Sequence, residues 1–126
     1  MKVIIAGSRP IISFSIVEKA VEKSGWKNEI TEIISGCARG VDKLGEMWAR
    51  NHGIPVKRFP ADWDKHGKSA GYKRNVKMAE YGDALIAIWI DSSKGTAHMV
   101  NTMKKLGKPT YIHQILQTNK ILKGRR

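Results

Sequence analysis

The chain has 126 residues, enough for one domain that buries its own hydrophobic core without disulfides. Its single cysteine excludes an internal disulfide and is typical of a reducing compartment. No apolar stretch approaches the roughly 20 residues that span a bilayer, and the apolar run before Gly7 is too short for a signal peptide. We therefore expect a cytoplasmic protein without membrane contact.

The formal net charge of +12 is unevenly distributed along the chain. Residues 92–126 contain eight basic side chains and no acidic one. Such a surplus attracts polyanions, so the basic C-terminal third is compatible with nucleic-acid binding. The alternative is a solvated surface that continues into a tail, and we favour it because no nucleic-acid-binding motif accompanies the charge.

Short apolar runs alternate with longer amphipathic segments along the chain. The pattern predicts strands at residues 3–6, 30–34, 55–59, 84–90 and 109–113, and helices at 13–24, 41–52, 72–81 and 96–106. Residues 60–70 are predicted to be a loop. Val76 and Ala79 are expected to face the core from the third helix. Met99, Val100, Met103 and Leu106 are expected to face it from the last one.

Five strands that alternate with helices are the signature of βαβ units. They predict an α/β protein, a three-layer αβα sandwich around a mainly parallel five-stranded sheet. We place this domain at residues 1–113 and a basic C-terminal tail at residues 114–126.

Ligands of open α/β sheets bind outside the carboxyl ends of the strands. Three of the loops at that edge are rich in small, hydroxylated or basic residues: "GSRP" at 7–10, "SGCARGVD" at 35–42 and "DSSKGT" at 91–96. Glycine lets a phosphate approach the backbone N–H groups at a helix N-terminus, and serine, threonine and arginine add further donors. The three loops together favour a phosphate-bearing ligand over ordinary turns.

The candidate ligand-binding residues belong to these loops and to the start of the helix predicted at 72–81. They are Gly7, Ser8, Arg9, Ser35, Gly36, Arg39, Gly40, Asp42, Arg74, Asn75, Lys94, Gly95 and Thr96. Structural roles stay open for some of them. Arg39 could form a surface ion pair, Asp42 could be a ribose acceptor or stabilise a helix dipole, and Thr96 could cap a helix.

No catalytic residue, metal site or cofactor is assigned. The four histidines are not spaced as metal ligands, and one cysteine makes no cluster. Cys37 has no histidine base implied by spacing, so we interpret it as a small residue in a tight loop rather than a nucleophile. Trp63 could stack on a base, although anchoring of its loop is the preferred interpretation.

Five segments, in chain order, resemble the SLOG superfamily, the Rossmann-like group that includes DprA and the LOG phosphoribohydrolases. They are "GSR" at 7–9, "SGCARGVDKLGEMWA" at 35–49, "FPADW" at 59–63, "GYKRNVKM" at 71–78 and "KGTAHMV" at 94–100. Within the superfamily the chain is most similar to the YspA-like, YpsA-related branch. The resemblance implies a Rossmann-like fold and a pocket for a nucleotide or nucleotide-derived small molecule, such as an ADP-ribose-like one. It is also compatible with a homodimer.

One departure from the LOG hydrolases bears on activity. Their fourth loop resembles P-G-G-x-G-T-x-x-E, and its glutamate serves the hydrolysis of an N-glycosidic bond. Here Gly95 and Thr96 match, but Met99 stands at the glutamate position, and a thioether is neither an acid nor a base. We therefore expect binding or sensing of a nucleotide-derived ligand. The alternatives are an N-glycosidase or phosphoribohydrolase-type enzyme that uses another acid, and a DNA-associated protein that uses the basic C-terminal region.

Overall fold

The computed structural model describes residues 1–10, 13–90 and 93–115. Within these residues the elements follow the chain as β1 (Lys2–Gly7), α1 (Phe14–Ser24), β2 (Glu32–Ser35), α2 (Val41–Asn51), β3 (Val56–Arg58), α3 (Trp63–His66), α4 (Ala70–Tyr81), β4 (Ala84–Ile90), α5 (Lys94–Lys105) and β5 (Thr110–Ile115). Single 3-10 turns lie at Lys27–Glu29 and Gly67–Ser69. The predicted basic tail lies outside the described residues from position 116 onward.

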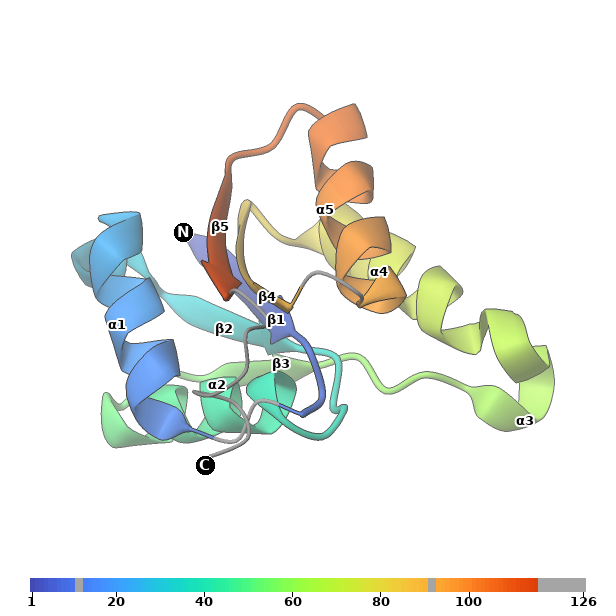
Figure 1. Ribbon diagram of the computed structural model, residues 1–126, viewed down its shortest axis with the longest axis horizontal. Coiled ribbons are helices and arrows are strands. Elements are labelled where there is room, and N and C mark those ends of the chain that lie inside the picture. Colours follow the sequence, from blue (N-terminus) through green and yellow to red (C-terminus); the bar gives the residue numbers. More distant parts are fainter. Residues whose placement is uncertain (11–12, 91–92, 116–126) are drawn as a thin grey trace.

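The described strands form one sheet in which every neighbouring pair is parallel, in the order β3-β2-β1-β4-β5. The strand order reverses between β1, the central strand, and β4 beside it (Figure 1). In an open α/β sheet this reversal leaves a crevice at the carboxyl ends of the strands, because the connections diverge to opposite faces. The predicted α/β class and the Rossmann-like sheet are confirmed.

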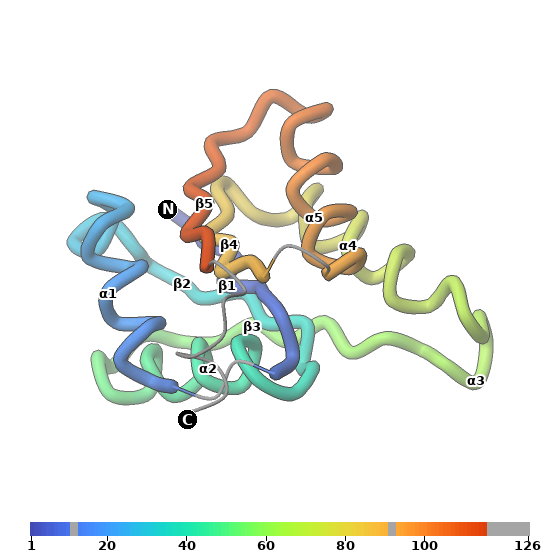
Figure 2. The backbone as a smooth tube through the Cα atoms, in the orientation of Figure 1, coloured from blue at the N-terminus to red at the C-terminus, as the bar shows by residue number. Residues whose placement is uncertain are grey.

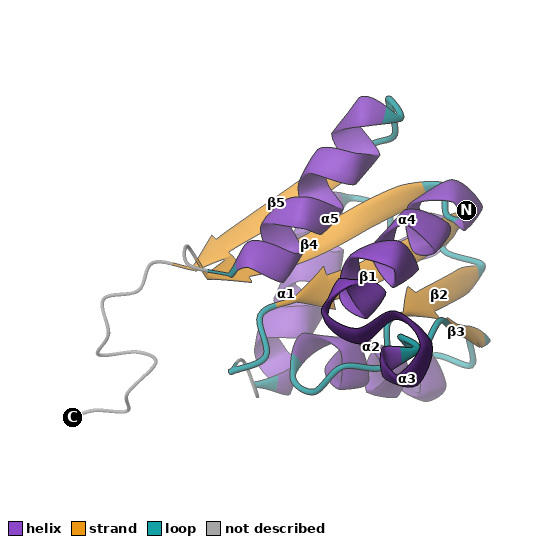
Figure 3. Ribbon diagram, turned by 90° about the vertical axis from the view of Figure 1, so that its right-hand side faces the viewer, coloured by secondary structure: helices purple, strands orange, loops and turns teal. Residues whose placement is uncertain are grey.

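Helices cover both faces of the sheet, as Figures 1 and 3 show. Successive side chains of a strand point to opposite faces. Val3 and Ile5 of β1 therefore pack in a core with α1 and α2, whereas Ile4 and Ala6 pack in a second core with α4 and α5. All of these side chains are at most 8% exposed, so helices cover both faces of β1 and the three-layer sandwich is confirmed.

The segment after β3 differs from its prediction as a loop. It contains the helical turn α3, which Asp62 caps by accepting a hydrogen bond from the Lys65 backbone N–H at 3.1 Å. In the tube of Figure 2 the chain runs outward from β3 to α3 and then returns along α4. The prediction was wrong because aspartate, glycine and lysine read equally well as a loop or as a short capped helix.

Two predicted core positions are also wrong. Val76 is 39% exposed, and Met78 is buried on α4 instead; Leu106 is 46% exposed, whereas Met99, Val100 and Met103 of α5 are buried as predicted. The last strand, in turn, includes Gln114 and Ile115, two residues beyond its predicted end. No helix of the described residues is long and apolar enough to cross a bilayer.

The end of β1 is fastened tightly to β4. A Cβ added to Gly7 would overlap the carbonyl oxygen of Ile88 and lie 2.9 Å from Val41 Cγ2. Immediately beyond, the backbone N–H of Ser8 donates to Ile88 O at 3.1 Å, and the Ser8 hydroxyl accepts from the Ile90 N–H at 3.0 Å. The loop that leaves β1 therefore starts from a fixed position.

The far end of α4 is held by Lys108, which precedes β5. Its ammonium donates to the carbonyl oxygens of Ala79 and Gly82, each at 2.8 Å, and to that of Glu80 at 3.1 Å. Carbonyl groups at a helix C-terminus lack partners within the helix and carry partial negative charge, so a cation is stabilising there.

Replacement of Gly7 by alanine should destabilise the fold by about 1–3 kcal/mol, because the added methyl group forces β1 and β4 apart. The matched control is Gly95→Ala, where a Cβ meets no atom within 4 Å. We expect that control to leave stability unchanged or raise it by up to about 1 kcal/mol. Urea unfolding followed by circular dichroism measures both variants, and equal midpoints for the two would contradict the prediction.

Candidate functional site

The loops after β1 and β2 meet at a direct contact. Gly40, the residue before α2, has φ +76°, and a Cβ there would overlap the carbonyl oxygen of Arg9. Only glycine tolerates both the left-handed backbone and the approach of another main chain. The segments "GSRP" and "SGCARGVD" are therefore neighbours in space.

The same loop after β2 also contacts α4. Arg74 donates a hydrogen bond from Nη1 to the carbonyl oxygen of Gly36. A Cβ on Gly36 would lie 2.7 Å from that nitrogen and 2.8 Å from Asp42 Oδ2, so glycine leaves room for the two charged groups. Burial lowers the pKa of the Arg74 guanidinium, and the Asp42 carboxylate opposes that effect.

A third set of contacts joins α4 to the start of α5. The buried amide of Asn75 lies 3.4 Å from the carbonyl oxygen of Gly95 and 3.2 Å from Nδ1 of His98. His98 also stacks on Tyr72, with 4.2 Å between the ring centroids. The predicted pair Arg74 and Asn75 thus connects the loop after β2 with the loop after β4.

The N-terminus of α5 has its own cap. The Ser93 hydroxyl accepts from the Thr96 backbone N–H at 3.4 Å and lies 2.8 Å from the Thr96 hydroxyl. Serine 93, rather than Thr96, therefore acts as the N-cap residue. Asp91 and Ser92, the first two residues of the predicted loop, lie outside the described residues.

The predicted site residues fall into two groups by exposure. Ser8, Ser35, Gly36, Asp42, Asn75 and Thr96 are buried, Gly7, Gly40 and Arg74 are half-buried, and Arg9, Arg39, Lys94 and Gly95 are exposed. The buried members bond to neighbouring segments of the protein, as Ser8 does to Ile90 and Asn75 to Gly95, and the exposed Arg9, Arg39 and Lys94 supply the cations. Among the described residues no carboxylate lies within 4.0 Å of the basic groups of Arg9, Arg39 or Lys94, so the surface ion pair considered for Arg39 is not formed there.

Asp42 is directed toward its own loop. It is 5% exposed, and Oδ2 accepts from the Ala38 backbone N–H at 3.1 Å. Burial raises the pKa of Asp42 to about 6, against the opposing effects of the Ala38 and Gly7 backbone N–H groups and of Arg74. A carboxyl group with this pKa is part protonated near neutral pH, and its predicted contact with a ribose stays a prediction.

A second buried carboxylate, Glu46, was not predicted from the sequence. It accepts from the Ser35 hydroxyl at 2.6 Å and from Arg58 Nη2 at 2.9 Å. Burial acts to raise the pKa of Glu46, but these hydrogen bonds and Lys43 outweigh it and lower the pKa. The Ser35 hydroxyl also accepts from the Cys37 N–H at 3.1 Å, so Glu46 supports the loop from beneath. Its position beside the apolar residues of α2 gave no sign of this role.

Three other residues singled out in the sequence have clear positions. Cys37 is partly buried and adopts φ +67°, which is uncommon for a residue other than glycine. Trp63 begins α3 and is 52% exposed. Met99 is 1% exposed and packs with Ile4 and Leu85 in the core beneath α5, so the position of the LOG glutamate is apolar and sealed.

Asp42 should make stability depend on pH with a defined sign. Because its folded-state pKa of about 6 exceeds the value of 3.8 for an ordinary aspartate, the native state binds the proton more tightly than the unfolded chain. The resulting stability is fully present below about pH 3.8 and is lost as the pH rises through 6. Relative to Asp42→Asn, the wild type should gain on the order of 1–3 kcal/mol between pH 7.5 and pH 4.5.

Urea midpoints of the two proteins at both pH values test this expectation. The comparison with the Asn variant removes the contributions of the other titrating groups, including Glu46 and His98, whose pKa values are also shifted. Parallel pH curves for the two proteins would contradict the buried, proton-binding state of Asp42.

Comparisons with known proteins agree with this geometry. Residues 1–66, which contain the loops after β1 and β2, match the YspA, cpYpsA-related SLOG family. The chain is also 37% identical over 83 residues to the Gene 61 protein of Mycobacterium phage D29. That match covers 61% of this chain and 66% of the phage protein, so the chain spans just under two thirds of that relative.

The family match covers more than half of the chain, and the contacts around Gly36, Gly40 and Arg74 lie at the carboxyl edge of a sheet with the Rossmann-like order. The chain therefore belongs to the YspA, cpYpsA-related SLOG family.

Proposed function

We propose that the protein binds or senses a nucleotide-derived, ADP-ribose-like ligand at the carboxyl edge of β1, β2 and β4. The observation that carries the proposal is the chain of contacts among the predicted segments: Arg9 with Gly40, Gly36 with Arg74, and Asn75 with Gly95. Four segments that are separate in sequence converge at the edge where open α/β sheets bind ligands. Membership of a SLOG family supports a nucleotide-type ligand in general terms.

The charges at this edge suit an anion. Arg9, Arg39 and Lys94 are exposed and lack carboxylate partners among the described residues, so their full charge is available. The Cys37 and Ala38 N–H groups already bond to Ser35 and Asp42. We therefore assign phosphate recognition mainly to the arginine side chains and less to the backbone of this loop.

Binding without hydrolysis is favoured by the position of Met99. A glutamate that acts on a glycosidic bond must reach the sugar, whereas this side chain is enclosed in the core between α5 and the sheet. The site then has an anion-binding rim and no acid in the position that the LOG hydrolases use.

Calorimetric titration of the full chain with ADP-ribose, NAD and AMP tests the binding proposal. We expect at least one of these ligands to bind, and Arg39→Gln to weaken that binding roughly 10- to 100-fold, the usual effect of losing one charge-assisted hydrogen bond. Arg50→Gln, at the opposite end of α2, removes the same charge and should leave the affinity within about twofold. Absence of binding by all three ligands at millimolar concentration would overturn the proposal.

Chromatography after prolonged incubation with AMP and ADP-ribose tests the absence of hydrolysis. We expect both nucleotides to be recovered intact, because no ionisable group occupies the position of the LOG glutamate. Release of free adenine by the wild type, abolished in Asp42→Asn, would instead establish the N-glycosidase alternative with Asp42 as its acid.

A further inference from the structure

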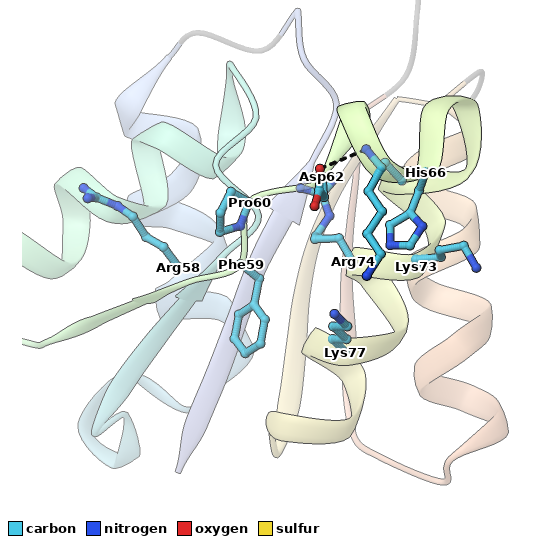
Figure 4. A pocket seen from close by; sticks show the side chains of 10 residues that line it. Arg58, Phe59, Pro60, Asp62, His66, Lys73, Arg74 and Lys77 are labelled. Carbon is cyan, nitrogen blue, oxygen red and sulfur yellow. Dashed lines mark hydrogen bonds between the residues drawn. The ribbon is translucent and has the colours of Figure 1, made fainter.

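A cavity of about 220 Å³ lies on the α4 side of the segment that follows β3 (Figure 4). Phe59, Pro60 and Ala70 give it apolar surface, and polar residues from the end of β3, from α3 with its cap and from α4 line the rest. Arg74 is the residue that this cavity shares with the nucleotide site, since the same guanidinium donates to Gly36 O. The other lining residues were not among the sites predicted from the sequence.

The cavity is strongly basic. Lys65, Lys73, Arg74 and Lys77 line it, and none of them has a carboxylate within 4.0 Å among the described residues. Asp62 is the one acidic residue in the lining, and its carboxylate already accepts the Lys65 backbone N–H as the cap of α3. The Asp42 carboxylate acts on Arg74 from the side of the loop after β2, but the three lysines have no such partner among the described residues, so their positive charges repel one another.

Helix stability does not account for this arrangement. Lys73 and Lys77 are four residues apart on α4, a spacing at which like charges are destabilising. The first turn of α4 contains no acidic residue and its last turn no basic one, although a helix dipole favours the opposite placement of charge. These charges destabilise the helix that carries them. Their position at the wall of a cavity therefore points to an anionic ligand.

Arg58, a fifth basic residue in the lining, provides an internal comparison. It is paired with Glu46 at 2.9 Å, and in Figure 4 its side chain extends away from the other basic residues. The protein thus neutralises the arginine that supports the loop after β2. It leaves the three lysines and Arg74 at the cavity without such a partner among the described residues.

We propose that this cavity binds a group of two or more linked phosphates, either a free oligophosphate or the diphosphate of a nucleotide. Its volume corresponds to roughly seven water molecules at about 30 Å³ each, which suits a pyrophosphate-sized anion better than a whole dinucleotide. Cations from both α3 and α4 can contact separate phosphates, because lysine ammonium groups bind as flexible point charges. The cavity adjoins the nucleotide site at Arg74, so the nucleotide form of the proposal rests on the proposed function, whereas the free-oligophosphate form does not.

The test is calorimetric titration of the full chain with inorganic pyrophosphate and with inorganic phosphate, at low and moderate salt. We expect pyrophosphate to bind about tenfold or more tightly than phosphate, and the double variant Lys65→Gln, Lys77→Gln to lose at least that factor. The control, Lys104→Gln with Lys105→Gln at the end of α5, removes the same charge far along the chain and should change affinity less than about twofold. Equal pyrophosphate affinity in wild type and cavity variant, or equal losses in cavity variant and control, would overturn the proposal.

Titrations with ADP and AMP distinguish the two sources of the phosphates. A nucleotide diphosphate in the cavity predicts that ADP binds more tightly than AMP, that the Lys65, Lys77 variant abolishes the difference, and that pyrophosphate competes with ADP. A free oligophosphate predicts pyrophosphate binding without displacement of either nucleotide. Pyrophosphate binding with no nucleotide binding would refute the nucleotide proposal alone. Nucleotide binding, together with the same pyrophosphate affinity in the wild type and in the Lys65, Lys77 variant, would refute the cavity proposal alone.

Discussion

The contact between the end of β1 and the Ile88 carbonyl is the constraint on which this edge of the protein depends. Because Gly7 lies against that carbonyl, the two central strands approach closely at the point where the strand order reverses. Ser8 then bonds to both Ile88 and Ile90, which fixes the origin of the loop that reaches Gly40. A side chain at position 7 would move all of these partners together.

Two carboxylates one turn apart on α2 support the loop above them in different ways. Glu46 is stabilised as an anion by Ser35 and Arg58, whereas burial leaves Asp42 with a raised pKa despite the nearby Arg74. Their hydrogen bonds hold Ser35 and the Ala38 N–H from the inner side of the loop. The anion site that we propose lies on the outer side, where Arg39 has no carboxylate within 4.0 Å among the described residues.

Sequence periodicity located every long element, since buried strands such as Ala84–Ile90 and amphipathic helices such as Val41–Asn51 carry strong local signals. It also correctly predicted that these loops lie at one edge of the sheet, because parallel strands place their carboxyl ends together. It could not find α3, whose single turn depends on the Asp62 cap, nor the exposure of Val76, which depends on how α4 is rotated against the sheet. The role of Glu46 and the basic cavity could not be predicted for a related reason: both depend on residues from other segments of the chain.

The ammonium of Lys108 shows how part of the positive charge of this molecule is stabilised at helix ends. Three carbonyl oxygens surround it at the end of α4, and Lys104 and Lys105 stand at the end of α5, where helix dipoles offset positive charge. These dipoles stabilise the three positive charges at the helix ends without removing them. At the α3–α4 corner, Lys65, Lys73 and Lys77 have no carboxylate partner among the described residues, so an anion that approaches this corner is attracted by them as well.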